Sequence, residues 1–275
     1  MTGPAIHRLP LNAILGTALV GLLVAAILIG LFWMPYGPIA IDLDHPLAPP
    51  SWAHWFGTDQ FGRDVLSRAM LGARISTSIA LGTVVVAIST GTCVGLITGF
   101  LRGWTDRLLM AASDAILAFP GILLALALIA VLGSSRSSII LALSIAYLPS
   151  VARVVRSAVL SIREREYIEA SRVAGDGTIY IVLRHVLPNA LPPVVVLATS
   201  LFGWVVLAES ALSFLGVGVP PPAPSWGNML SDARPYMEAA NWLSIVPGFC
   251  IMGTVLGVNL LGDALRDWLD PRGET

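Results

Sequence analysis

Lysine is absent from this sequence, and all 16 basic residues are arginine. A phosphate-binding loop of the Walker type needs a lysine before its serine or threonine, so this absence excludes ATP hydrolysis by that route. Charge is scarce as well, at 12% of 275 residues, whereas 56% are hydrophobic. Because a soluble globule of this size presents more polar surface, the composition indicates a protein of the lipid bilayer.

Other scarcities exclude further classes of site. The two cysteines, Cys93 and Cys250, lie in apolar stretches, where a thiol behaves as a small hydrophobic group, so neither a disulfide framework nor a metal site is expected. The four histidines are scattered along the chain, which argues against a catalytic cluster. A net charge of -1 without a dense basic cluster argues against nucleic acid as a partner.

Six stretches are apolar and long enough to cross a hydrocarbon layer of about 30 Å. The first, residues 13–34, has 22 uncharged residues and no small-residue cleavage site after it, so we expect a retained helix and not a signal peptide. The other expected spans are 74–102, 108–132, 138–155, 192–215 and 242–261. The sequence therefore predicts an all-α membrane protein with six transmembrane helices.

Arginine distribution predicts the orientation, because basic residues in short loops are retained in the cytoplasm. With the N-terminus inside, 11 arginines are cytoplasmic and 5 are outside, which favours an N-in, C-in topology. Residues 1–12 and 265–275 are then cytoplasmic, and residues 35–74 and 216–241 lie outside. Residues 75–264 form a five-helix core, interrupted on the cytoplasmic side by a polar segment at about 160–190.

That polar segment has the pattern of two short helices. Residues 163–174 are good helix formers, and Gly175 is suited to the left-handed conformation that ends a helix. Apolar residues at helical spacing follow from Ile179 to Val186, and Pro188 is expected to stop that second helix. Periodicity alone favours a specialised contact segment and an ordinary interfacial loop equally.

The segment EASRVAGDGTIYIVLRHVLP resembles the cytoplasmic EAA loop of permease subunits of ATP-binding cassette (ABC) importers. In that pattern E-A-A is followed by three residues, G, nine residues, I, one residue and L-P. The positions that match the spacing are Glu169, Ala170, Gly175, Leu187 and Pro188. Ser171 replaces the second alanine, and His185 stands in place of isoleucine, a departure typical of the peptide-transport branch.

Three further stretches narrow the resemblance: FGTDQFGRDVLSRAMLGARIS, ESALSFLGVGVPPPAPSWGNML and NLLGDALRDWLDPR. They are similar to the dipeptide/oligopeptide/nickel permease family and, within it, to the second, C-type inner-membrane subunit. The resemblance implies a type I importer permease fold in a bacterial inner membrane. It implies as partners a second dissimilar permease, two cytoplasmic ATPase domains that bind ATP and Mg, an extracytoplasmic solute-binding protein and membrane lipid. No cofactor is expected in this chain itself.

The family also implies roles for particular residues. Contact with the ATPase is expected from the EAA segment, at Glu169, Ala170, Ser171, Arg172, Gly175, Leu187 and Pro188. Because loops this long on a compact membrane protein are usually functional, docking of the binding protein is expected on the outer face, at Asp59, Arg63, Pro221, Pro222 and Trp226. Peptides are the expected substrate, with nickel, haem or another peptide-like solute as the alternative.

Charges and small residues inside the spans have two interpretations. Asp114 and Glu209 either line the translocation path or make structural hydrogen bonds, since an acid at bilayer depth costs about 2.5–3.5 kcal/mol without a partner. Ser89, Thr90 and Gly91 either line a passage or allow close helix packing. A secondary transporter is a remote alternative, because no pair of broken helices in matching halves is evident in the sequence.

Overall fold

The computed structural model describes residues 11–269, which form ten α-helices, one π-helical turn and one 3-10 turn. Within that range, β structure is limited to one isolated bridge between Thr58 and Asp64. Five helices are long and apolar enough to cross a membrane, and a bent pair makes a sixth crossing if its two parts count as one span. This agrees with the all-α membrane fold expected from the sequence.

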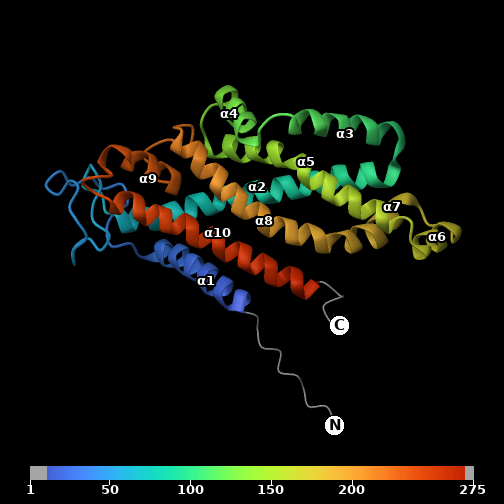
Figure 1. Ribbon diagram of the computed structural model, residues 1–275, viewed down its shortest axis with the longest axis horizontal. Helices are drawn as coiled ribbons and strands as arrows, with labels where there is room; N and C mark the ends of the chain where they lie inside the picture. The colour runs from blue at the N-terminus through green and yellow to red at the C-terminus, as the bar shows by residue number, and fades with distance from the viewer. Residues whose placement is uncertain (1–10, 270–275) are drawn as a thin grey trace, which may run out of the picture.

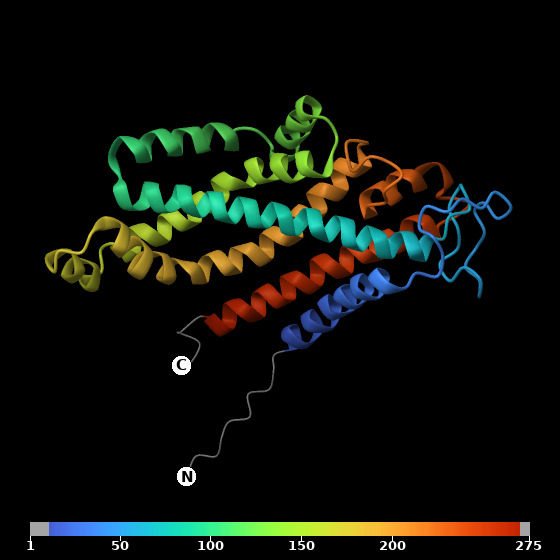
Figure 2. The same cartoon turned by 180° about the vertical axis from the view of Figure 1, so that it is seen from behind.

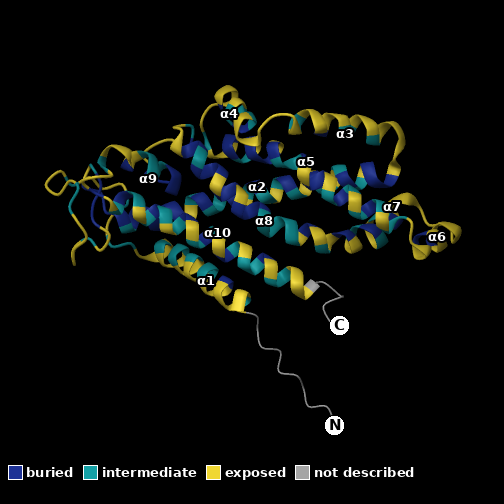
Figure 3. Cartoon of the chain, viewed as in Figure 1, coloured by how far each residue is buried: buried dark blue, intermediate teal, exposed yellow. Residues whose placement is uncertain are grey.

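Four long helices, α2 (Val65–Leu101), α5 (Arg136–Ile162), α8 (Leu187–Phe214) and α10 (Trp242–Leu269), run side by side along the long axis of the molecule (Figure 1). Helix α1 (Leu11–Phe32) lies beside α10 at the edge of the bundle and buries only Gly16. Figure 3 shows the buried residues concentrated where α2, α5 and α8 meet, and exposed residues along α1 and α3.

The two ends of the bundle differ. One end, here the α6 end, carries α6 (Glu166–Val173) and α7 (Thr178–Ile181). The opposite, α9 end carries the irregular segment 33–64, α9 (Trp226–Ala233) and the 3-10 turn Arg234–Tyr236. Figures 1 and 2 both show α1 beginning and α10 ending on the side that faces the α6 end.

The second expected span begins earlier than its charge pattern suggests. Helix α2 starts at Val65, nine residues before Arg74. The extracytoplasmic segment expected over residues 35–74 therefore ends at Asp64. Asp64 is the N-cap, and its carboxylate accepts hydrogen bonds from the backbone N–H of Ser67 at 2.8 Å and from its hydroxyl at 2.7 Å. Such a cap satisfies orphan donors of the first turn, which explains why the helix starts here.

The third expected span is broken, so the prediction of one continuous helix over 108–132 was wrong. Helices α3 (Gly103–Leu117) and α4 (Gly121–Leu132) meet at 91° around Pro120. Proline lacks an N–H and disfavours helical backbone at the residue before it, so the sequence Phe119–Pro120–Gly121 ends one helix and starts another.

Helices α2 and α5 pack closely through a repeat of small residues. A Cβ atom added at Gly91, Gly95 or Gly99 would lie 2.6, 2.5 or 2.7 Å from the Cβ of the valine opposite it. Those valines, also four residues apart on α5, are Val151, Val155 and Val159. Of the two interpretations of Gly91, close packing is therefore the one observed.

Helix α8 begins without the stop expected at Pro188. Residues Val182–Val186 form a π-helical turn, the N–H of Leu187 bonds to the carbonyl of Val182, and the helix continues through Pro188 at its start. In an α-helix, a proline ring clashes with the carbonyl four residues earlier, and a wider π turn relieves that conflict. The amide of Asn189 also donates to the carbonyl of His185 at 2.6 Å.

Candidate functional site

The α6–α7 segment is the most exposed helical part of the predicted cytoplasmic side. Helix α6 places Ile168 in full burial and Ser171 at 8% exposure, whereas Glu169, Ala170 and Arg172 face outward. Of the residues expected to contact a partner, Ser171 therefore turns inward, which corrects that expectation. Leu187 is half-buried at the start of α8, and Pro188 is exposed there.

Gly175 adopts the positive φ predicted for it, at +91°. Its N–H bonds to the carbonyl of Arg172, and the next N–H, of Asp176, reaches back to the carbonyl of Ser171 at 3.1 Å. The Ser171 hydroxyl donates to the Asp176 carboxylate and holds the same turn together. The bend is thus set by the backbone of Gly175 and the short Ser171 side chain.

Two arginines fasten this segment to the end of α2. Arg163 donates through Nη1 to the carbonyl of Phe100 at 3.0 Å, and the Arg172 guanidinium lies 5.4 Å from the centroid of the Phe100 ring. His185, from the π turn, lies between Tyr167 of α6 and Tyr180 of α7, with ring centroids 6.3 and 5.9 Å apart. A displacement of α6 therefore acts on both α2 and the start of α8.

An apolar surface stands open on this segment. Its members are large side chains exposed by between 44% and 84%: Tyr167, Val173, Ile179, Tyr180 and Leu183. Charged Glu169, Arg172 and Arg184 lie exposed on the same segment. Apolar side chains rimmed by charges are typical of a protein-contact surface.

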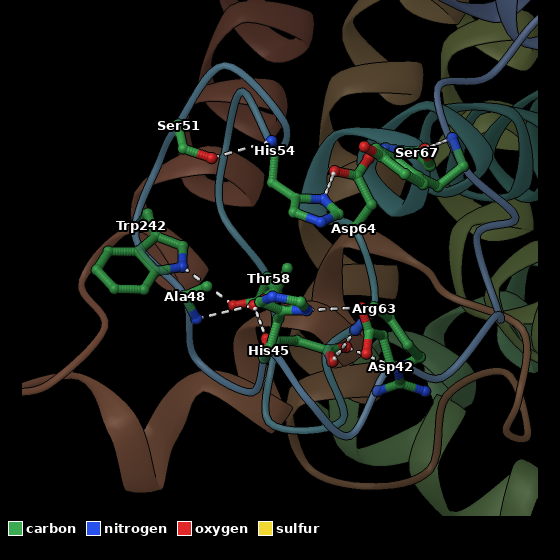
Figure 4. A network of polar contacts seen from close by, with 12 residues as sticks. Asp42, His45, Ala48, Ser51, His54, Thr58, Arg63, Asp64, Ser67 and Trp242 are labelled. Atoms are coloured by element: carbon green, nitrogen blue, oxygen red, sulfur yellow. Dashed lines mark hydrogen bonds and ion pairs between the residues drawn. The ribbon is translucent and has the colours of Figure 1, made fainter.

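At the opposite end, the irregular segment 33–64 is folded by polar contacts (Figure 4). Thr58 is fully buried, donates from its hydroxyl to the carbonyl of His45 at 2.6 Å and accepts from the N–H of Ala48 at 2.8 Å. The Trp242 indole donates to the Thr58 carbonyl at 3.2 Å, which ties the segment to α10. His54 pairs with Asp64, the N-cap of α2, at 3.0 Å.

Asp59 and Arg63 belong to this folded end and are not free for docking. They are 5% and 9% exposed, and Arg63 Nε lies 2.6 Å from Asp59 Oδ2. Arg68, 4% exposed, contacts the same carboxylate at 3.3 Å and Asp232 of α9 at 3.6 Å. The expectation that Asp59 and Arg63 meet a binding protein was therefore wrong. A charge-rich loop motif predicts an exposed surface, but here the charges neutralise one another inside the fold.

Trp226 is also buried, which contradicts the expectation that it meets a binding protein. Pro221 and Pro222, expected in the same role, are exposed. The Trp226 side chain is 1% exposed, and its indole donates to the carbonyl of Ala69 at 3.1 Å. Ser225 caps α9 by accepting from the N–H of Asn228 at 3.2 Å. The outer loop 216–241 thus contains a helix anchored to α2.

Glu209 lies completely inside the bundle. Its carboxylate accepts from Ser213 at 2.7 Å and from Ser76 of α2 at 3.2 Å. The Ser76 hydroxyl also accepts from the backbone N–H of Trp226 at 3.3 Å. Of the two interpretations of Glu209, these contacts support a structural link between α2, α8 and α9.

Unlike Glu209, the other residues expected as candidates for the translocation path, Asp114, Ser89 and Thr90, are exposed. Asp114 is 62% exposed and pairs with Arg153 of α5 at 2.6 Å. Ser89 and Thr90 are exposed, and the Thr90 hydroxyl donates to the carbonyl of Val86 at 2.6 Å. Whether they line a path stays a prediction.

Arg153 and Arg156 were not predicted as site residues, because arginines near the end of the expected span 138–155 were assigned to the cytoplasmic side. Helix α5 continues to Ile162 and includes both. The signal was available in the sequence, since Asp106 and Asp114 precede the two arginines in the chain and carry the opposite charge. Arg156 forms two bonds to Asp106, at 2.7 and 2.8 Å.

Comparison with known proteins places these features in a family. The model of the family described as binding-protein-dependent transport system inner membrane component matches residues 91–274. A dipeptide transport system permease, DppC, of Alkalihalophilus pseudofirmus is 46% identical over 82% of this chain and 74% of its own length. A glutathione transport system permease, GsiD, of Pectobacterium atrosepticum is 41% identical over 92% of this chain and 85% of its own.

A solved structure shares the fold at lower identity. The permease chain of the inward-facing methionine ABC transporter MetNI superposes with a TM-score of 0.60 at 21% identity, over 72% of this chain and 94% of that one. At this identity the likeness concerns the type I importer permease fold alone.

Proposed function

The chain belongs to the family of binding-protein-dependent transport system inner membrane components, and from that membership we propose that it carries di- or oligopeptides inward. It is a multi-pass inner-membrane permease subunit, and energy for transport comes from partner subunits. A second, dissimilar permease would complete the path, two ATPase domains would bind ATP and Mg, and an external binding protein would deliver the peptide. Relatives named for dipeptides, di- and tripeptides and glutathione support peptides over nickel.

The structural observation that supports coupling to an ATPase is the open apolar surface of α6 and α7 at one end of the bundle. Val173 is 84% exposed and Ile179 is 75% exposed, on a bend fastened to α2 and α8. Covering such side chains with a partner stabilises a complex by about 1.5–3 kcal/mol per fully buried large aliphatic residue. A cytoplasmic ATPase seated there would move α6, and the movement would reach the spans through Phe100 and His185.

The test is reconstitution of this chain in proteoliposomes with its partner permease, ATPase subunits and binding protein. We expect accumulation of a labelled dipeptide that requires ATP and the binding protein, with ATP hydrolysis stimulated by the loaded binding protein. A complex with an ATPase partner unable to hydrolyse ATP is the control. Accumulation of free or chelated nickel without any accumulation of peptide would contradict the substrate assignment and leave the importer assignment intact.

A further inference from the structure

A groove of about 560 Å³ lies between α3 and α5. Its lining is almost entirely charged: Asp106, Arg107, Met110, Asp114, Arg153 and Arg156. Pockets that hold small molecules measure about 300–1,000 Å³, so the groove has room for a short peptide. It is separate from the α6–α7 surface and from the polar contacts of the α9 end.

The charged groups are paired across the groove but keep open sides. Arg153 Nη2 lies 2.6 Å from Asp114 Oδ1, and the two side chains are 53% and 62% exposed. Arg156 and Asp106 pair closer to the start of α3 and are more covered, at 31% and 16%. The Arg153–Asp114 pair therefore presents donors and a carboxylate oxygen to whatever fills the groove.

The position of this pair along the spans restricts what can lie against it. Asp114 follows the start of α3 by eleven residues and Arg153 precedes the end of α5 by nine. At roughly 1.5 Å per residue these separations are about 17 Å and about 14 Å along the helix axes. A half-exposed ion pair is costly wherever it lies against lipid tails. It must face water or another polar group.

The groove also carries an excess of positive charge. Three arginines line it against two aspartates. The third, Arg107, lies 5.7 Å from the Trp104 ring, and within residues 11–269 it has no ion-pair partner. A guanidinium with free donors binds a carboxylate with strong, directional hydrogen bonds.

We propose that the α3–α5 groove is a stretch of the translocation path and that Arg153, supported by Arg107, binds the terminal carboxylate of a peptide in transit. Asp114 positions the Arg153 guanidinium and limits its positive charge, so the carboxylate is held briefly and released. This inference rests on the proposed peptide transport and names one contact of the substrate within it.

The first test compares two substrates in two complexes. Uptake of a labelled dipeptide with a free carboxylate and of its C-terminal amide is measured for the wild type and for Arg153→Gln in the same reconstituted importer. We expect the preference for the free carboxylate to fall about tenfold in Arg153→Gln, while Arg136→Gln on the same helix, outside the groove, leaves it unchanged. Because the binding protein is identical in both complexes, its own preference cancels in the ratio.

An equal loss for both substrates in Arg153→Gln would mean a merely structural ion pair and would overturn the proposal. Absence of peptide uptake by the wild type would instead overturn the proposed function. If the amide is too poor a substrate to measure, the second test decides.

The second test asks whether water and peptide reach the groove in the assembled importer. In a chain with Cys93 and Cys250 replaced by alanine, Asp114→Cys and Met110→Cys are treated with a small, membrane-impermeant thiol reagent supplied on the α6 side. We expect both to react at least tenfold faster than Val85→Cys, an exposed position of α2 outside the groove, and expect free-carboxylate peptide at saturating concentration to slow them. Thiols that stay unreactive would show that another subunit fills the groove, and the proposal would be wrong.

Discussion

Gly62 and Gly175 adopt the same backbone region at opposite ends of the molecule, with φ of +71° and +91°. A Cβ atom at Gly62 would lie 1.7 Å from the carbonyl oxygen of Asp42, whereas one at Gly175 would meet nothing within 4 Å. At Gly62 both the neighbouring atoms and the positive φ require glycine, whereas at Gly175 only the positive φ does. Around Gly62 the α9 end is closely packed by its own chain, whereas around Gly175 the α6 end leaves open space.

The polar groups follow the same division. At the α9 end, Asp59, Arg68 and Thr58 are buried. Arg68 contacts the Asp59 carboxylate, and the Thr58 carbonyl accepts a hydrogen bond from the Trp242 indole. At the α6 end, apolar Val173 and Ile179 are exposed. The α9 end exposes apolar side chains too, such as Trp52 and Leu43, so the two ends differ in their polar contacts and not in apolar exposure. Because burial of apolar surface is the main stabilising term, exposed apolar side chains at either end are suited to contact with a partner.

Gly62→Ala should cause the largest loss of stability among these variants. A mild loss would contradict the close packing inferred around Gly62. The added methyl collides with backbone and also strains a positive φ, so we expect a loss of about 3–5 kcal/mol in the free energy of unfolding. Thermal unfolding of the detergent-purified chain measures it. Gly103→Ala, at φ +73° with nothing within 4 Å, is the control and should lose only about 1 kcal/mol. Similar losses in both would show that the α9 end is not tightly packed.

The double variant Val173→Ser, Ile179→Ser tests the opposite end. Both side chains are exposed in the free chain, so its thermal stability should stay the same, while affinity for the ATPase subunits should fall about 100-fold through lost apolar burial. Val131→Ser, 86% exposed on α4, is the matched control. Affinity is measured by titrating ATPase subunits onto the reconstituted permeases, and unchanged affinity would place the ATPase elsewhere.

Gly175→Val should sharpen the distinction between folding and transport. Valine strongly disfavours positive φ, but the open surroundings leave the rest of the chain unaffected. We expect normal insertion with uptake reduced at least tenfold. Gly177→Val, at an extended φ of -71°, should transport normally, and equal uptake by the two variants would exclude a role for the bend.

Glu209→Gln should have the smallest effect. The amide keeps the shape of the carboxylate but brings a donor towards hydroxyls that now donate, so reorganising Ser76 and Ser213 should cost about 1 kcal/mol of stability. Peptide uptake per folded complex should remain as in the wild type. A loss of uptake without a change in unfolding temperature would return Glu209 to the translocation path.

Much of the fold follows from local patterns in the sequence. Apolar length predicted five of the crossings as helices, and the need for a positive φ was readable at Gly175 because helix formers precede it. The break at Pro120 was missed because apolar composition hides a change of direction, although proline followed by glycine signalled it.

The site was less predictable, because roles depend on which residues the fold brings together. Asp59, Arg63 and Trp226 look like loop residues until the chain folds back and buries them against α2 and α9. Arg153 gains its meaning only from Asp114, 39 positions earlier in the chain. Such pairs are tertiary facts, and no local periodicity contains them.

The π turn at Val182–Val186 has a consequence for angular phase. A π turn inserts one extra residue into an α-helix, so side chains before it are rotated by about 100° relative to an uninterrupted helix. The one extra residue of the π turn therefore determines the direction in which Ile179 and Tyr180 of α7 point around the axis of α8. Straightening the turn would swing that whole contact surface to another side of α8 without changing the identity of any side chain on it.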